Sequence, residues 1–131
     1  MLETGIKGMG KTIVTEEKTA RFMGSGTLEV FATPAMIALM EHTAYESVAP
    51  YLEPGKGTVG TLMNVKHVSA TPCRMKVTCE TELIEINGRE LIFSVKAWDE
   101  KGLIGEGEHR RFIIDEEKFL ARAMSKGIVN A

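Results

Sequence analysis

The chain has 131 residues, the size of one domain, and its 44% hydrophobic and 26% charged residues are typical of a globular protein. Its formal net charge is -2 with no block of like charge, so nothing in the composition favours binding to nucleic acid or to an anionic membrane. The longest apolar run, residues 35–40, is too short to span a bilayer, and the N-terminus lacks a secretory pattern, so we expect a single cytoplasmic domain over residues 1–131.

The first clear element is a helix that begins at Thr33 and Pro34 and continues to about Val48, after a weaker strand pattern around residues 12–16. Threonine is a good N-cap, and proline suits the first helical position. Residues 35–40 are apolar on every side, which predicts a helix that is buried all round. The helix should end before Pro50.

Alternating apolar and polar residues then predict four strands, over residues 58–69, 75–85, 91–98 and 103–114. Asn87-Gly88 is a strong hairpin signal, and residues 100–102 form a second turn. Asp115 should cap a short helix that reaches about Met124. The pattern predicts an α+β domain in which one curved antiparallel sheet wraps around one helix. Such a sheet has an uncovered edge, which favours a dimer.

The two cysteines, Cys73 and Cys79, lie six residues apart in what reads as one strand. At roughly 3.3 Å per residue they would be about 20 Å apart. A disulfide requires Cα atoms within about 7 Å. We therefore expect two free thiols, in keeping with a reducing compartment.

Glu41 is the most distinctive residue, because it interrupts an apolar stripe of the helix that contains Ile37, Ala44 and Val48. Burial disfavours the charged carboxylate, so we expect the pKa of Glu41 to rise. Such a group is a candidate nucleophile or general base. The residues leave one alternative open, in which Glu41 simply pairs with a buried arginine or histidine.

His67 shares the strand parity of Val59 and Met63, so it should point inward, although a lone histidine on an apolar face is more often a core residue. Thr33 is explained as an N-cap, but a helix N-terminus also offers N–H groups to a developing oxyanion. Gly60 lies within a strand, where glycine often marks the close approach of another backbone or a ligand.

Two further histidines are weaker candidates. His42 lies off the Glu41 stripe, and His109 sits in a charged stretch, residues 108–111. The sequence contains no phosphate-binding loop, dinucleotide fingerprint, nucleophile elbow or zinc motif. It therefore gives no case for a serine hydrolase or a metal site.

Several short segments form a recognisable set: Val30-Phe31-Ala32-Thr33, Leu39-Met40-Glu41, residues 49–55, Gly60-Thr61, His67, and residues 70–72, 87–89, 107–109 and 117–119. Together they closely resemble the fluoroacetyl-CoA thioesterase family of hotdog-fold proteins. The similarity covers nearly the whole chain after about Lys11. The spacings also agree, with eight residues from Thr33 to Glu41 and twenty-six from Glu41 to His67.

The resemblance implies a hotdog fold, with an antiparallel sheet around a long central helix, and a homodimer with active sites at the subunit interface. It implies that Thr33, Glu41 and His67 are the catalytic residues. Gly60 matches a glycine near the thioester, and Arg111 matches a basic position for the coenzyme A phosphates. We therefore expect hydrolysis of a short-chain acyl-CoA, with coenzyme A only as part of the substrate and no other cofactor.

The chain departs from the family at one place. The fluoroacetyl-specific enzymes have a longer segment, rich in phenylalanine and proline, before the Val-Phe-Ala-Thr match. Here only residues 22–28 occupy that place, and Phe22 is their one aromatic residue. We expect this cover segment, residues 22–28, to be a short lid with Phe22 near the acyl group, and to give little selectivity for fluorine.

Two other functions are compatible with such a fold. A non-catalytic domain that binds acyl-CoA or another small ligand is the main alternative, since fold does not determine function. The presence of all three site residues favours the enzyme. A hydratase would need an Asp-His pair in a hydratase motif, and the sequence has none.

Overall fold

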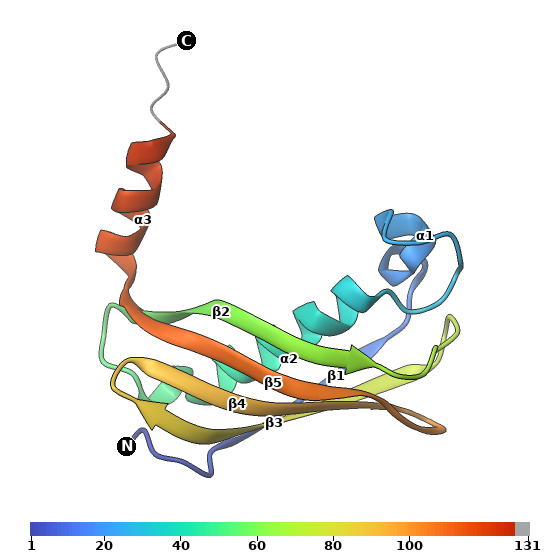
Figure 1. Ribbon diagram of the computed structural model, residues 1–131, viewed down its shortest axis with the longest axis horizontal. Helices are drawn as coiled ribbons and strands as arrows, with labels where there is room; N and C mark the ends of the chain where they lie inside the picture. Colours follow the sequence, from blue (N-terminus) through green and yellow to red (C-terminus); the bar gives the residue numbers. More distant parts are fainter. Residues whose placement is uncertain (128–131) are drawn as a thin grey trace.

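One antiparallel sheet and one long helix form the body of the molecule (Figure 1). The computed structural model describes residues 1–127. The sheet has five strands in the order β1-β3-β4-β5-β2. In chain order the elements are β1 (Lys7–Ile13), η1 (Glu16–Lys18), α1 (Ala20–Met23), α2 (Thr33–Val48), η2 (Ala49–Tyr51), β2 (Lys56–His67), β3 (Lys76–Asn87), β4 (Glu90–Asp99), β5 (Gly102–Asp115) and α3 (Glu116–Lys126).

The four strands after α2 confirm the prediction, with small shifts at their ends. β3 and β4 join through the predicted hairpin, where Asn87 pairs with Glu90. The second turn is held by Asp99, whose Oδ1 accepts hydrogen bonds from the backbone N–H groups of Lys101 (2.8 Å) and Gly102 (3.1 Å). Asp115 caps α3 as expected, because its side chain accepts from the N–H of Lys118 at 3.2 Å.

The position predicted for the first strand was wrong, because β1 lies at Lys7–Ile13 and not at residues 12–16. β1 pairs with β3 and lies under α2, where a side-chain carbon at Gly10 would overlap the hydroxyl of Thr43. Close packing against the helix therefore selects glycine at a position where the sequence pattern looks for an apolar side chain.

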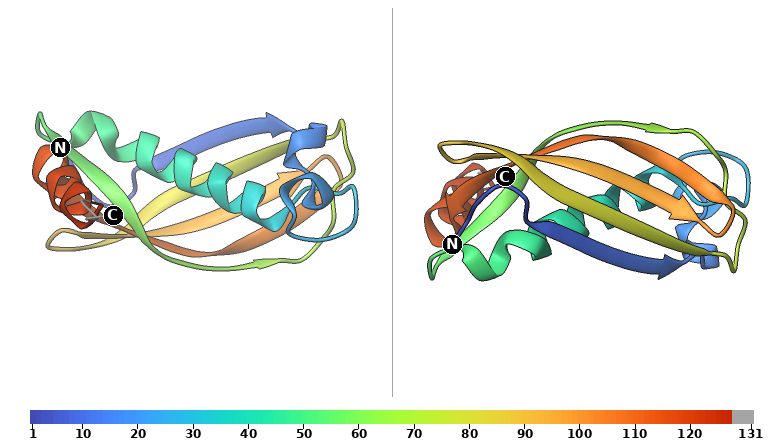
Figure 2. Two further views of the ribbon diagram at one scale, coloured as in Figure 1. Left: turned by 90° about the horizontal axis from the view of Figure 1, so that it is seen from above. Right: turned by 90° about the horizontal axis from the view of Figure 1, so that it is seen from below.

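The helix α2 runs along one face of the sheet (Figure 2) and buries one side only. Met36, Met40, Ala44 and Val48 are fully buried against the sheet, whereas Ala38 is exposed. The prediction that the first half of the helix is buried all round was therefore wrong for the single chain. The physical reason is that one sheet covers one side of a helix, and the apolar residues on the other side have no cover from their own chain.

Both cysteines are free thiols, as predicted. Cys79 is buried in β3, and burial raises the pKa of its thiol to about 11. The prediction that Cys73 lies in the same strand was wrong. The backbone turns at Arg74, whose φ is 77°, and β3 begins only at Lys76.

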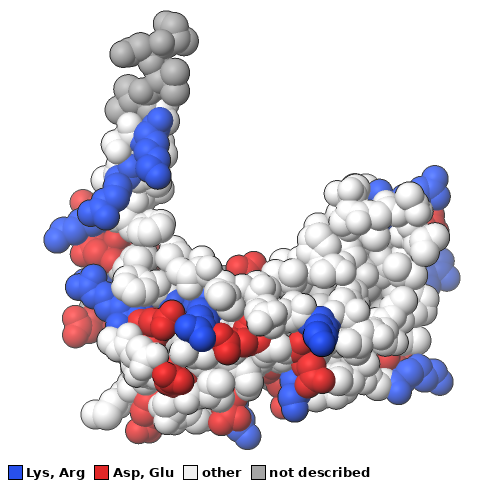
Figure 3. Space-filling view, viewed as in Figure 1, with Lys and Arg blue, Asp and Glu red and all other residues white. Residues whose placement is uncertain are grey.

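The edge strand β2 has β5 as its paired neighbour in the described chain, and its other edge is free. α3 continues from β5 and stands clear of the body, while α1 rises at the opposite end of β2 (Figure 1). Figure 3 shows a hollow between these two elements, with mostly uncharged atoms along its floor. Within residues 1–127 no helix is both long and apolar enough to cross a membrane.

Candidate active site

Thr33 and His67 meet where α2 begins and β2 ends. The Thr33 Oγ1 lies 2.8 Å from Nδ1 of His67. The N-cap prediction for Thr33 was wrong, since Ala32 occupies the N-cap position and Thr33 is the first helical residue. The Thr33 hydroxyl is therefore free to orient the imidazole. The ring of Phe31 meets the His67 ring edge-on, with centroids 6.4 Å apart.

The His67 ring is partly buried and has one unused nitrogen. Burial lowers the pKa of His67, and the nearby backbone of Ser69 opposes this effect. The imidazole is consequently neutral at neutral pH. Its Nε2 is buried and has no hydrogen-bond partner within residues 1–127. A neutral ring with a free nitrogen can exchange a proton with a bound substrate or water.

A cavity of about 320 Å³ adjoins this pair. Its lining residues come from α1 and the segment that joins it to α2, from the start of α2, and from the end of β2 and the loop after it: Ala20, Ser25, Val30, Phe31, Thr33, His67, Val68, Ser69 and Ala70. The cover segment contributes Ser25 to this wall. Phe22, the predicted substrate contact, is 63% exposed and is not part of the wall.

Glu41 belongs to a second group, near the middle of α2. Its carboxylate faces Gly60 on β2, together with two side chains of β5. A side-chain carbon at Gly60 would lie 2.8 Å from Glu41 Oε2, 3.3 Å from His109 Cε1 and 3.4 Å from Arg111 Nη1. Only glycine leaves room for these three groups to converge, which gives a physical reason for Gly60 at this position.

A β-bulge at Thr61 aims Gly60 at Glu41. The pairing with β5 shifts between Gly60, which pairs with Arg111, and Leu62, which pairs with Arg110. The expected parity, which placed Val59 on the same face as Met63 and His67, was therefore wrong, because the extra residue reverses the alternation. Even-numbered residues face α2 before the bulge and odd-numbered residues face it afterwards, so His67 points inward as expected.

Arg111 is held by three hydrogen bonds. Its Nε donates to Thr58 Oγ1 at 2.8 Å, its Nη2 to the Thr58 carbonyl at 2.9 Å, and its Nη1 to His109 Nε2 at 3.2 Å. The guanidinium also lies 5.7 Å from the centre of the Tyr45 ring. At 7% exposure it faces Glu41 and not the solvent. Burial lowers the pKa of Arg111, and the charge of Glu41 opposes that effect.

His109 is the site residue that sequence reasoning ranked too low. It is 1% exposed, and its Nδ1 lies 2.8 Å from the Leu62 carbonyl. A carbonyl only accepts, so Nδ1 carries the proton and Nε2 accepts from Arg111. Burial is the main cause that lowers the pKa of His109, which keeps the ring neutral. The available signal was its two-residue spacing from Arg111, which places both on one face of a strand.

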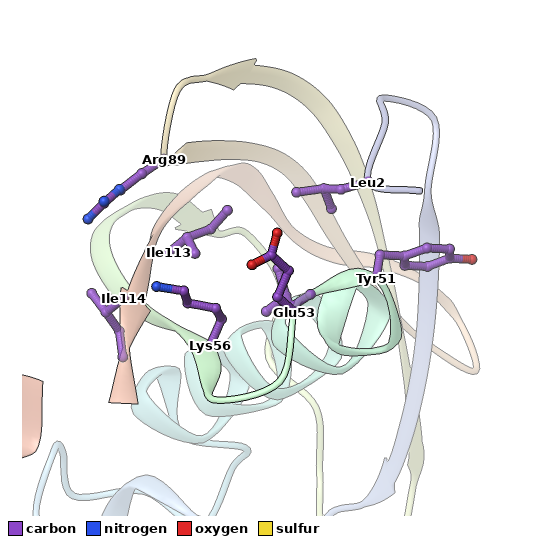
Figure 4. Close-up of a pocket in the computed structure, with 8 residues that line it drawn as sticks. Leu2, Tyr51, Glu53, Lys56, Arg89, Ile113 and Ile114 are labelled. Atoms are coloured by element: carbon purple, nitrogen blue, oxygen red, sulfur yellow. The ribbon is translucent and has the colours of Figure 1, made fainter. Parts of the chain in front are cut away.

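A second cavity, also of about 320 Å³, lies at the opposite end of β2 (Figure 4). Its lining residues are Leu2, Tyr51, Leu52, Glu53, Lys56, Arg89, Ile113 and Ile114. The Lys56 ammonium lies 3.8 Å from Asp115 Oδ2. This cavity contains none of the three predicted catalytic residues. Since the two cavities are equal in volume, the chemistry of the lining and not its size identifies the candidate site.

A family model described as fluoroacetyl-CoA-specific thioesterase matches residues 14–117. The chain belongs to this family. A fluoroacetyl-CoA thioesterase from Streptantibioticus cattleyicolor is 46% identical over 98 residues, which cover 75% of this chain and 70% of the relative. These matches confirm the resemblance and, with it, the prediction of a thioester hydrolase.

Solved structures confirm that this member of the fluoroacetyl-CoA-specific thioesterase family has the predicted hotdog fold. The fluoroacetyl-CoA thioesterase FlK superimposes with a TM-score of 0.91 at 38% identity, covering 96% of this chain and 98% of FlK. A thioesterase superfamily member from Thermus thermophilus gives a TM-score of 0.86 at 28% identity, covering 96% of this chain and 95% of that protein.

In this family member a single chain does not bring the three predicted catalytic residues together. Thr33 and His67 are in contact, but Glu41 lies eight residues further along α2, a rise of about 12 Å. Within residues 1–127 the Glu41 carboxylate has no hydrogen bond to either residue, and Gly60, His109 and Arg111 surround it instead. Within the described residues, the Thr33–His67 pair and the surroundings of Glu41 are thus two separate groups.

Proposed function

We propose that the protein hydrolyses short-chain acyl-CoA thioesters at a site formed by Thr33 and His67 of one subunit and Glu41 of the partner subunit. The observation that carries this proposal is the 2.8 Å contact between Thr33 and His67 beside a cavity, with a free ring nitrogen. The relative from Streptantibioticus cattleyicolor and FlK are both named as fluoroacetyl-CoA thioesterases, which supports the thioester class.

The free edge of β2 supports a dimer that brings the Thr33–His67 pair of one subunit close to Glu41 of the partner subunit. If two β2 strands pair antiparallel, a two-fold axis exchanges their ends. An axis between Met63 and Asn64 would place Gly60 of the partner subunit opposite His67. Glu41 of the partner subunit, which faces its own Gly60, would then approach the Thr33–His67 pair. Each dimer would contain two such sites.

Glu41 would work in one of two ways. As a nucleophile, its carboxylate attacks the thioester carbonyl, forming a mixed anhydride as the carbon–sulfur bond breaks and the coenzyme A thiolate leaves. Water then cleaves the anhydride, with the neutral His67 taking a proton from that water and passing it to the thiolate. As a general base, Glu41 instead takes a proton from the water that attacks the carbonyl, and that proton finally reaches the thiolate.

Thr33 would fix the orientation of the His67 ring. Its hydroxyl contacts the His67 ring at Nδ1, and Nε2 has no partner within residues 1–127 and would be available for the reaction. The start of α2 lies beside it, and the unpaired N–H groups of a helix start favour negative charge on a carbonyl oxygen. This mechanism uses these protein groups and water, with coenzyme A only as part of the substrate.

The test is a hydrolysis screen of acyl-CoA thioesters of increasing chain length, with release of free thiol as the readout. We expect turnover on the short chains. A protein that binds these thioesters saturably but releases no thiol would instead be the non-catalytic binding domain considered from the sequence.

A further inference from the structure

The C-terminal helix α3 presents an apolar stripe without a partner in its own chain. The stripe consists of Phe119, Leu120 and Met124, which are 45%, 61% and 63% exposed. The spacing places these residues on one side of the helix and Lys118 and Arg122 on another. None of the eleven residues of α3 is buried, and an isolated helix of that length is marginal in water. The stripe therefore needs a surface to cover it.

A second apolar surface lies at the other end of β2. Phe22, Met23 and Leu28 of the cover segment are 63%, 45% and 66% exposed, and the neighbouring Val68 is 57% exposed. α3 follows directly after Asp115, which pairs with Lys56 at the start of β2. The α3 stripe and the second apolar surface therefore lie at the two ends of the same edge strand. Both α1 and α3 extend beyond that edge, with the hollow between them (Figures 1 and 3).

From this arrangement we propose that the α3 stripe of one subunit docks on the cover segment and Val68 of its partner. The inference rests on the dimer of the proposed function, since antiparallel pairing of β2 exchanges the ends of the strand. The same two-fold axis that pairs the edges carries α3 to the partner's α1 end. A second copy is favoured as the occupant because one chain supplies both surfaces, at positions that this axis exchanges.

The docked helix would act as a lid on the partner's active site. Ala20, Ser25 and Val68 line the cavity beside Thr33 and His67, and they lie in or next to the surface that α3 would cover. The cover segment alone is short and contains one aromatic residue. α3 would add Phe119, Leu120 and Met124 to it and would exclude water from the thioester. Each subunit would thus supply its partner with both Glu41 and part of the lid.

Crosslinking between introduced cysteines tests this contact in the full chain. We would combine Met124→Cys with Met23→Cys in a Cys73→Ser background and treat the protein with a short bis-maleimide. The matched control is Arg122→Cys with Met23→Cys, because Arg122 is two residues from Met124 and lies on the opposite side of the helix from it. We expect a covalent dimer from the first pair and much less from the control.

Sedimentation of the same variants separates the possible failures. A dimer in solution without the 124–23 crosslink, or with equal crosslinking in the control, would overturn the docking of α3 and leave the dimeric site standing. A monomer would overturn both. As a second measurement, Leu120→Glu should speed amide exchange within α3 at least several-fold, whereas Lys118→Glu should not. Equal exchange rates in the two variants would contradict the proposal.

Discussion

The hydroxyl of Thr33 lies 2.8 Å from Nδ1 of His67, while Nε2 of the same ring is buried and has no hydrogen-bond partner in residues 1–127. A histidine that served only to pack the core would have no reason to keep a buried nitrogen unpaired, because such a group costs free energy. The geometry therefore favours a ring that is oriented on one side and used on the other.

His67→Ala should lower kcat by about 100- to 10,000-fold, the range expected for the loss of acid–base catalysis, with a smaller effect on KM. Steady-state kinetics on a short acyl-CoA checks this. Because burial lowers the pKa of His67, the wild-type rate should fall only on the acid side of the ordinary histidine value of 6.5, as the ring takes up a proton. An unchanged kcat together with a large loss of stability would mark His67 as a core residue.

Glu41→Gln should remove most turnover and leave the fold intact. Glutamine keeps the shape of the side chain beside Gly60 and Arg111 but is neither a nucleophile nor a base. Thiol release and thermal unfolding, measured on the same preparation, check the two parts of the prediction. A stable variant that retains a near-wild-type rate would show that Glu41 is not catalytic.

Mixing two inactive variants tests whether the site is shared between subunits. A heterodimer of Glu41→Gln and His67→Ala chains would contain one site with both residues intact and one site lacking both. After random exchange of equal amounts, about one quarter of the wild-type activity should return, since half of the dimers carry one good site of two. If both residues acted within one chain, the mixture would stay inactive.

His109 should support both stability and activity through Arg111. His109→Leu leaves Arg111 Nη1 without its acceptor, and the loss of a buried hydrogen bond to a charged group costs about 1.5–3 kcal/mol of unfolding free energy. Denaturant unfolding measures this loss. The kcat should also fall, because a looser guanidinium gives the Glu41 carboxylate a less fixed positive charge nearby.

The pH dependence of unfolding gives a second readout for His109. The pKa values of His109 and His67 are lowered in the folded protein, so the unfolded chain binds more protons on the acid side. Their contribution to stability is therefore complete above pH 6.5, the ordinary pKa of histidine, and is lost as the pH falls through the folded pKa values. His109→Leu should flatten part of this slope, and an unchanged slope would contradict a buried neutral His109.

Local patterns predicted most of the fold. The alternation of β3 to β5, the Asn87-Gly88 hairpin and the Asp115 cap are all properties of neighbouring residues, so the sequence shows them directly. β1 was misplaced because its packing under α2 requires glycine, and the exposed Ala38 was missed because the extent of the sheet is a tertiary property. The β-bulge at Thr61 likewise depends on the register with β5.

The site was predicted in part, and for a similar reason. The family resemblance named Thr33, Glu41, His67 and Gly60, and the structure shows the contact between Thr33 and His67. Periodicity and spacing did not show that Glu41 lies near Arg111 and His109, because this proximity relates a helix to a strand far along the chain. Arg111 faces Glu41, so its expected contact with coenzyme A phosphates stays a prediction.

The protein should discriminate weakly between fluoroacetyl-CoA and acetyl-CoA. Reading a single fluorine requires a rigid, dry surface beside the acyl group. The cover segment offers little of this, since α1 ends at Met23, Gly24 follows with a φ of 76°, and the one aromatic residue, Phe22, is 63% exposed outside the cavity wall. The α3 stripe of the partner subunit would add apolar cover without a polar group to contact fluorine.

We therefore expect kcat/KM values for the two substrates to agree within about tenfold, a difference of 1.4 kcal/mol in transition-state stabilisation. The measurement is a direct competition of both thioesters at equal concentration, with Phe22→Ala as a matched variant that should change the ratio little. A preference of several orders of magnitude for fluoroacetyl-CoA would instead assign the selectivity to the residues around Gly60. These residues include Arg111, which is a buried cation.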